Sequence, residues 1–364
     1  MVEWKKIGSV CTVITPPKKL KKECYQKEGL YPIIDQGQSD IVGYTDDEES
    51  LLTSDSYVLF GDHTRYVKYI SGKFAQGADG LKILKCDSFL NSKYFYYTFS
   101  NSSIPTRGYS RHWSIAKDIE IPIPPLSEQN RIVSILDTFT ESIENLKKQI
   151  SERKKQYEFY RDQLLDIERK PGVEMKAMGE IGSFIRGSGI QKSDFVEKGF
   201  PCIHYGQVHT KYGLSATSTI SFINESLFKK CKKAVKGDIV IATTSEDAEG
   251  VAKPVAWLGN EEVAISGDAY IFHHNQNGKF IAHQFVSHRF MLFKVKNATG
   301  TKVVRISGDS MAKFIVPLPS LTEQQRIVTI LDTFEASIAN LEQQLTHRQK
   351  QYEYYRNMLL TFDE

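Results

Sequence analysis

Two segments of the chain carry the same stripe of apolar residues at helical spacing. From Ile132 the apolar positions advance by alternating steps of four and three, through Leu136 and onward, and a second segment repeats the pattern from Ile327. A four-and-three spacing that continues over several heptads is typical of a coiled-coil stripe. The pattern therefore predicts long helices over residues 126–165 and 321–360, each about 60 Å long at a rise of about 1.5 Å per residue.

These two segments are also copies of each other. Residues 126–165 align with 321–360 without a gap, and about 25 of the 40 positions are identical. Two copies separated by a long insert do not form a solenoid, which stacks three or more short repeats directly on each other. We therefore expect two modules, each a globular part followed by a long helix. The helices are expected to bury their stripes against each other as an antiparallel pair, because the second helix must return along the first.

The start of each helix is marked by proline. The passages IEIPIPPLSEQ at 119–129 and FIVPLPSLTEQ at 314–324 alternate proline with apolar residues, which predicts an extended approach. Since these prolines forbid an earlier helix, Ser127 and Thr322 are expected to cap the two helices.

An arginine interrupts the apolar stripe at the same place in each copy, as Arg153 and Arg348. Two interpretations are open. The aliphatic stem packs in the seam while the guanidinium reaches water, or the arginine sets the helix register by pairing with a carboxylate.

The globular parts are diverged copies as well. YPIIDQGQ at 31–38 aligns with FPCIHYGQ at 200–207, and β-rich runs follow at 57–60 and 238–244. The sequence thus predicts an α+β protein, with two mixed α/β globular domains joined by two long helices in an antiparallel coiled coil and a pseudo-twofold internal repeat. The expected boundaries are 1–122 for the first globular domain, 123–168 for the first Pro-rich entry and helix, 169–317 for the second globular domain, and 318–364 for the second entry and helix.

The charge of the chain is concentrated outside the helices. Lys and Arg minus Asp and Glu gives +1 for 1–125, 0 for 126–170, +5 for 171–321 and −3 for 322–364. A positive excess in the globular parts suits weak attraction to nucleic acid. No run of 18 apolar residues and no signal peptide is present, so we expect a cytoplasmic protein without a membrane segment. The five cysteines are odd in number and form no CxxC, which favours inert thiols.

No catalytic or metal site is predicted. GSGIQKS at 187–193 has Gln191 where a phosphate loop needs its second glycine. His273 and His274 are neighbours in a predicted strand and point to opposite faces, which argues against a shared metal. The acidic run SEDAEG at 245–250 is interpreted as a solvated turn. This pattern favours a recognition or scaffolding protein.

Basic and amide side chains in the globular parts are the candidates for DNA contacts. Clustered lysines neutralise phosphates, while Arg suits guanine and Gln suits adenine through bidentate hydrogen bonds. The predicted DNA-binding residues are Lys18, Lys19, Lys21, Lys22, Gln36, Gln38, Arg107, Arg111, His204, Gln207, His209, Lys211, Lys230, Lys233 and Arg305.

The start of each long helix resembles the DNA-specificity subunits of type I restriction-modification enzymes. The residues that carry the resemblance are P-L-[ST]-E-Q-x-R-I-V-x-I-L-D at 125–137, repeated at 320–332 with Ser320 replacing the proline, and LLTF at 359–362. The layout of two target recognition domains, each followed by a long helix, covers the whole chain. The resemblance implies that each globular domain reads one half of a split, asymmetric target in double-stranded DNA.

The resemblance also implies partner proteins. In such complexes the helices dock two methyltransferase subunits that methylate adenine, and a separate ATP-dependent motor subunit cleaves DNA. S-adenosylmethionine, ATP and Mg are then expected on the partner subunits, and this chain is expected to be a non-catalytic specificity subunit without a cofactor. The alternative is a coiled-coil interaction scaffold that does not bind DNA. The predicted partner-binding residues are Glu128, Gln129, Arg131, Glu323, Gln324 and Arg326.

Overall fold

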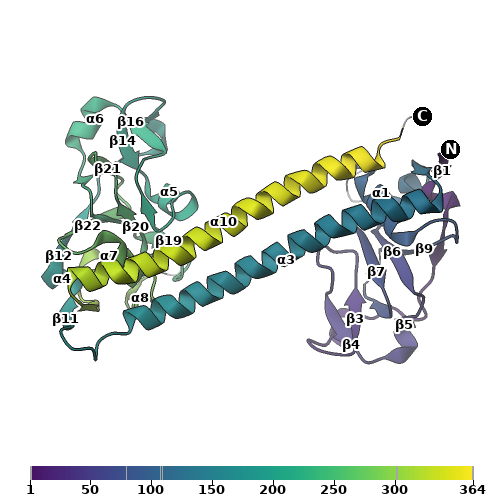
Figure 1. Cartoon of the computed structure of the whole chain (residues 1–364), viewed down its shortest axis with the longest axis horizontal. Helices are drawn as coiled ribbons and strands as arrows, with labels where there is room; N and C mark the ends of the chain where they lie inside the picture. The colour runs from purple at the N-terminus through teal and green to yellow at the C-terminus, as the bar shows by residue number, and fades with distance from the viewer. Residues whose placement is uncertain (1, 79, 107, 109, 301, 363–364) are drawn as a thin grey trace. The chain divides into compact units, whose positions relative to one another are not determined.

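The computed structural model divides the chain into two compact units, Met1–Lys147 with Gln343–Glu364, and Lys148–Glu342. Each unit holds one globular part and a segment of each long helix, α3 (Leu126–Leu165) and α10 (Leu321–Leu360) (Figure 1). The two long helices predicted from the apolar stripe are therefore confirmed. The residues that the structure describes are 2–78, 80–106, 108, 110–300 and 302–362.

The globular part of the first unit contains two four-stranded sheets and a separate pair of strands. One sheet has the order β2-β9-β6-β7 and is covered by α1; the other has the order β4-β3-β8-β5, with β3 and β8 parallel. The third pairing joins β1 to β10. The elements are β1 (Glu3–Lys6), β2 (Cys11–Ile14), β3 (Tyr31–Ile34), β4 (Gly43–Thr45), β5 (Leu51–Leu52), β6 (Ser56–Gly61), β7 (Val67–Ser71), β8 (Phe74–Gln76), β9 (Leu81–Cys86), α1 (Ser92–Asn101), α2 (Trp113–Ala116) and β10 (Glu120–Ile123).

The second unit repeats this plan with additions. Its sheets have the orders β12-β22-β18-β20-β15 and β13-β16-β14-β21-β17, with β14 and β21 parallel, and strand pairs join β11 to β24 and β19 to β23. The elements are β11 (Glu174–Ala177), α4 (Met178–Ile181), β12 (Gly182–Arg186), β13 (Phe195–Val196), β14 (Phe200–Ile203), α5 (Tyr205–Thr210), β15 (Ser215–Ala216), β16 (Ser221–Ile223), α6 (Glu225–Lys230), β17 (Lys233–Ala234), β18 (Ile239–Ala242), β19 (Thr244–Ser245), β20 (Lys253–Trp257), β21 (Val263–Ile265), β22 (Ala269–His274), α7 (Gly278–Phe285), α8 (His288–Asn297), β23 (Val304–Arg305), α9 (Gly308–Ala312) and β24 (Ile315–Leu318).

The Pro-rich passages before the helices are β-strands. Pro122 in β10 lies opposite Trp4 in β1, and Pro317 in β24 lies opposite Met175 in β11. Proline is tolerated there because each pair has only two strands, so an outer edge needs no donor. The extended approach predicted from the alternating prolines is confirmed, at the same register in both copies.

The predicted helix caps are wrong. The helices begin at Leu126 and Leu321, which places Ser127 and Thr322 inside the first turn. A capping side chain must lie before that turn to reach its free N–H groups. In the second helix this residue is Ser320, whose Oγ accepts from the Glu323 N–H at 3.3 Å.

The helix segments in each unit run antiparallel. In the second unit, Lys154 pairs with Glu342 at 2.8 Å, the Tyr157 hydroxyl donates to Glu335 at 3.1 Å, and the Tyr160 ring stacks on Phe334 at 5.4 Å. Residue numbers therefore rise along α3 as those of its α10 partners fall. In the first unit the Phe139 ring stacks on Tyr355 with centroids 5.2 Å apart. The predicted antiparallel pairing is confirmed.

The arginine in the seam packs against an aromatic ring. The Arg348 guanidinium lies 5.6 Å from the centroid of Phe139, a cation–π arrangement that leaves its charge near water. Within the described parts of the chain, neither Arg153 nor Arg348 forms an ion pair with a carboxylate. The observed contact favours the first of the two interpretations.

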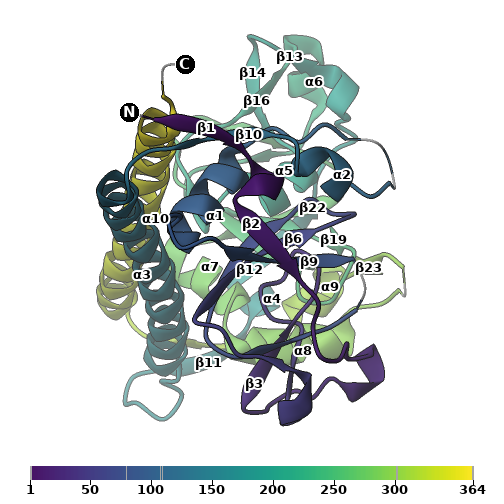
Figure 2. The same cartoon turned by 90° about the vertical axis from the view of Figure 1, so that its right-hand side faces the viewer.

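The ends of the helices belong to the cores of the globular parts. In the first unit, Ile132 and Leu136 of α3 are buried in the same cluster as Phe60 and Phe95, and α10 contributes Leu359. α1 lies against the first turns of α3 in both views (Figures 1 and 2). The second unit buries Ile327 and Leu331 of α10 and Leu165 of α3 in its largest cluster. Each globular part therefore packs on the start of one helix and the end of the other.

Candidate nucleic-acid interface

The strand registers establish which positions correspond in the two globular parts. Leu59 of β6 lies opposite Ile83, and Val240 of β18 lies opposite Ile271 at the same place in the other unit. The residues that follow these two strands, Asp62 and Thr243, are therefore equivalent. The sequence alone supplied no such correspondence, because the copies have diverged in this region.

A loop docks on these two residues in the same way. The His112 N–H donates to the Asp62 carbonyl at 2.8 Å, and the Ile306 N–H donates to the Thr243 carbonyl at 3.3 Å. Each docked residue is immediately preceded by an exposed arginine, Arg111 in one unit and Arg305 in the other. The fold thus places two of the predicted DNA-binding arginines at equivalent positions.

In the first unit three loops meet at this point, and we call them the first loop edge: residues 35–39, 62–66 and 110–112. The Gln36 side-chain oxygen accepts from the His63 N–H at 3.1 Å, and its carbonyl accepts from the Thr64 hydroxyl at 2.5 Å. The buried Asp62 carboxylate accepts from the Trp113 N–H at 2.8 Å. These bonds join the three loops, while Gln38 and Arg111 remain exposed.

In the second unit the corresponding loops form the second loop edge: residues 204–211, 243–252 and 302–306. His209 of α5 bonds through Nε2 to the Thr244 carbonyl at 2.9 Å, and Lys253 donates to the His209 carbonyl at 3.0 Å. Burial lowers the pKa of His209, which favours the neutral ring, and Nε2 must carry the proton because a carbonyl only accepts. Arg305 lies opposite Thr244 in the β19–β23 pair.

Each loop edge contains a residue with left-handed backbone. Arg65 has a φ of 65° and Ala252 a φ of 60°, and among the described residues these are the non-glycine positions with positive φ. They are equivalent, because each lies two residues before the strand position that faces Phe60 or Ile241. Such a conformation costs on the order of 1–3 kcal/mol. The backbone shape of the loop edge was retained in both copies while the side chains changed.

Both lysine clusters adjoin strands that pair with β3 and β14, the strands that lead into the loop edges. The Leu20 N–H donates to the carbonyl of Gln76 at the end of β8, and the Ile265 N–H at the end of β21 donates to Lys232. Lys18 pairs with Asp47 at 2.7 Å, and the Lys233 ammonium lies 5.1 Å from the Phe228 ring. The predicted lysines Lys18, Lys19, Lys21, Lys22, Lys211 and Lys230 are exposed, and Lys233 is half-buried.

Several residues predicted to contact bases form hydrogen bonds within the protein. His204 is buried, burial lowers the pKa of its ring, and its Nδ1 accepts from the Gly206 N–H at 3.2 Å as the cap of α5. His204 therefore has a structural role in the isolated chain, and its contact with DNA stays a prediction. Gln207 donates to the Ser221 hydroxyl at 2.6 Å, and Gln36 joins loops as described above. Arg107 lies outside the described residues.

The predicted partner-binding glutamines are buried anchors. Gln129 and Gln324 are both 0% exposed. The Gln129 oxygen accepts from the Asn91 N–H at 2.8 Å, and the Gln324 oxygen accepts from the Asn277 N–H at 3.0 Å. Each amide nitrogen also donates to a proline carbonyl before its helix. These bonds give both glutamines a structural role in the isolated chain, and their contact with a partner stays a prediction.

This anchor predicts a stability effect. Gln129→Leu and Gln324→Leu should each lower the free energy of unfolding by about 2–3 kcal/mol, because each removes a buried amide and leaves the N–H of half-buried Asn91 or Asn277 without its acceptor. Chemical denaturation of the purified chain measures the change. Gln156→Leu is the control, since Gln156 is exposed on α3 and should change stability by less than about 0.5 kcal/mol. Equal effects of all three substitutions would contradict the anchor role.

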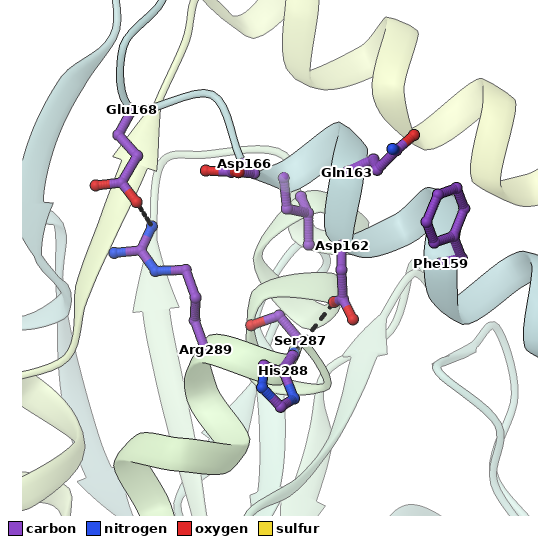
Figure 3. A pocket seen from close by; sticks show the side chains of 9 residues that line it. Phe159, Asp162, Gln163, Asp166, Glu168, Ser287, His288 and Arg289 are labelled. Carbon is purple, nitrogen blue, oxygen red and sulfur yellow. Dashed lines mark hydrogen bonds and ion pairs between the residues drawn. The ribbon is translucent and has the colours of Figure 1, made fainter.

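An exposed aromatic position near the end of each helix was missed in the sequence. Phe159 is 58% exposed and borders a groove of about 450 Å³ in the second unit, together with Asp162 and Arg289 (Figure 3). Asp162 accepts from the His288 N–H at 3.1 Å. Tyr354, at the same position of the repeat, is 65% exposed in the first unit. The available signal was an aromatic residue kept at an outward position of both copies.

No group of three or more His, Cys, Asp or Glu side chains could hold a metal ion, within the ranges that the structure describes. No helix in the described part of the chain is long and apolar enough to cross a membrane.

Comparison with known proteins identifies the family. The type I restriction modification DNA specificity domain matches residues 1–153 and 171–348. The chain is 31% identical to the specificity subunit of the type I restriction enzyme EcoR124I/EcoR124II from Escherichia coli, over 99% of this chain and 94% of that protein. It is 27% identical to a putative type I restriction enzyme specificity subunit from Haemophilus influenzae, over 99% and 96%.

The fold is likewise similar to a solved structure, the type I restriction-modification system S subunit from M. genitalium. The TM-score is 0.60 at 17% sequence identity, and the match covers 100% of this chain and 97% of that one. The family model and the relatives match nearly the whole sequence, including both globular parts and both long helices. The chain therefore belongs to the DNA specificity subunits of type I restriction-modification systems, which are not themselves catalytic.

Proposed function

We propose that this chain selects the DNA sequence on which a type I restriction-modification complex acts. Each globular part reads one half of a bipartite target through its loop edge. The paired helices set the spacing between the half-sites and dock two methyltransferase subunits for adenine methylation. With an ATP-dependent motor subunit the same complex restricts unmodified DNA in the cytoplasm.

The observation that carries this proposal is the equivalence of the two loop edges. Both hold an exposed arginine next to the same docking hydrogen bond, and both keep a left-handed residue at the same position. A shared backbone frame with different side chains is what two readers of different sequences require. Arginine is also the side chain that most often reads guanine in the major groove.

The lysine clusters supply the part of binding that does not depend on sequence. Lys19 and Lys21 in the first unit, and Lys230 in the second, are exposed beside the sheet that ends at the loop edge. Phosphate contacts of this kind give affinity that falls steeply with salt and orient a protein on the duplex. The arginines and Gln38 then determine which bases are accepted.

The starts of the two helices present one surface twice, which suits two copies of one partner. Glu128 pairs with Arg131 at 2.6 Å, and Glu323 pairs with Arg326 at 2.7 Å. Beside these exposed pairs, Leu126 is 45% exposed and Leu321 is 57% exposed. An apolar side chain rimmed by charged residues is typical of a protein interface. We assign these two surfaces to the methyltransferase subunits.

The test is to map methyladenine in a host that lacks other methyltransferases. The chain is co-expressed with the methyltransferase subunit of its complex, and single-molecule sequencing records every methylated adenine. We expect one bipartite motif with a fixed gap, and no methylation when this chain is omitted. A scaffold that does not bind DNA would leave the methylation pattern unchanged on its removal. That result would overturn the proposal.

A further inference from the structure

Two lysines are buried with their charges turned toward the protein. Lys68 of β7 is 7% exposed and Lys294 of α8 is 6% exposed; among the described residues, these are the lysines that fall in the buried class. Burying an ammonium is unfavourable unless its donors are satisfied. Burial lowers the pKa of both side chains, against the opposing effect of nearby carboxylates. Because a buried lysine does not contribute to solubility, its presence at these two positions needs another explanation.

Lys68 closes a loop of the first loop edge. Its ammonium donates to the carbonyl of Asp35 at 3.0 Å and to the carbonyl of Ser39 at 2.5 Å. These two acceptors flank Gln36 and the exposed Gln38, so one charge holds both ends of the segment that carries them. The carboxylates of Asp35 and Asp40 raise the pKa of Lys68 and so oppose the effect of burial.

Lys294 does the same in the second loop edge from a different element. Its ammonium donates to the carbonyls of Glu249 and Val251, the latter at 3.0 Å. Val251 immediately precedes Ala252, the left-handed residue of this edge. The acidic run 245–250, which the sequence suggested was a solvated turn, is therefore fastened to the core at one end.

Contacts to backbone carbonyls do not depend on the side chains of the loop. An ammonium offers three donors in a flexible arrangement, so it can hold a loop whose side chains differ from one reader to another. The two lysines are not equivalent by position, because Lys68 lies opposite Leu59 in a strand while Lys294 lies in a helix. A buried lysine that donates to loop carbonyls therefore occurs in each unit at a position of its own.

We propose that Lys68 and Lys294 are positioning residues for DNA recognition, each holding a loop of one loop edge in the shape that reads its half-site. This inference rests on the function proposed above. It assigns no DNA contact to either lysine. Loss of the ammonium should loosen one loop and thereby relax discrimination in one half of the target.

The test replaces each lysine by methionine in the full chain, assembled with its methyltransferase subunit. Methionine keeps the unbranched stem and removes the donors. Lys68→Met should raise the methylation of sites with a single mismatch in the first half about tenfold relative to the intact site, without changing the second half. Lys294→Met should raise the methylation of sites with a single mismatch in the second half, without changing the first half. Lys85→Met on β9 and Lys296→Met on α8 are matched controls, because both side chains are exposed.

The outcomes separate positioning from stability. A uniform fall in methylation at an unchanged motif would show a structural role only and would overturn the inference. Unchanged discrimination against mismatched sites in both Lys68→Met and Lys294→Met would also overturn it. Lys68→Gln and Lys294→Gln are measured in parallel, because an amide keeps a neutral donor. They should give intermediate relaxation even if methionine prevents assembly, and a strict motif in assembled glutamine variants also overturns the inference. If the unaltered chain yields no bipartite motif, the proposed function itself fails.

Discussion

Replacing residues 1–122 by residues 172–317 of the same chain is expected to give a methylated sequence that contains the second half-site twice. The described loops of the first loop edge lie within 1–122, so the original first half-site should disappear. The junction preserves the fold because Pro122 and Pro317 occupy the same strand position before their helices. Mapping of methyladenine in cells that carry the hybrid complex measures the result.

The exchange also preserves the contacts of the globular part with α3. Asn91, the N-cap of α1, bonds to Asn130 of α3, and Lys93 of α1 bonds to Asp137. The second unit has the same Asn-x-Lys pattern at 277–279. The reciprocal hybrid, with 1–122 in place of 172–317, is the control and should contain the first half-site twice. Persistence of the original motif in either hybrid would contradict separate reading by the two units.

Removal of Arg111 or Arg305, the exposed arginine before each docked residue, is expected to weaken recognition in one half-site only. A bidentate arginine–guanine contact contributes about 1–3 kcal/mol, so Arg111→Ala should reduce methylation of the intact target roughly 5- to 150-fold. Arg305→Ala should give a similar loss through the other half. Methylation rates on duplexes with the mapped target, and with each single base replaced, provide the measurement.

Base reading and phosphate binding predict different patterns for these arginines. Loss of a base contact relaxes discrimination at one position, whereas loss of a phosphate contact weakens all sequences alike and reduces the salt slope by about one. We expect the first pattern. Lys117→Ala is the matched control, because Lys117 is an exposed cation just after α2. Uniform weakening by Arg111→Ala would remove it from the base-reading set.

Features that depend on local pattern were predicted well. The helices end where the repeat ends, at Leu165 and Leu360, because a four-and-three stripe and the absence of breakers act over a few residues at a time. The Pro-rich strands follow from the fixed φ of proline. The duplication could be recognised from the sequence, because aligning two segments requires no information on tertiary contacts.

The candidate site was predicted less completely, because polar residues look alike in sequence whether they face DNA or the protein. Gln129 matched the family motif and His204 carried base-reading chemistry, yet both are buried and bonded to nearby backbone. Which polar group finds a protein partner depends on segments far apart in the chain. Asn91, for example, meets Gln129 only after α1 packs on α3.

The sequence by itself determined that this protein is a duplicated pair of modules with a shared helical frame, because periodicity and identity are local properties of the chain. Only the tertiary structure decided which side chains form the two loop edges. Arg111 and Arg305 became equivalent, and Arg65 and Ala252 adopted the same left-handed backbone, through hydrogen bonds between strands and loops distant in sequence. Long-range pairing of this kind has no local signature, since its free energy appears only once the sheets have formed.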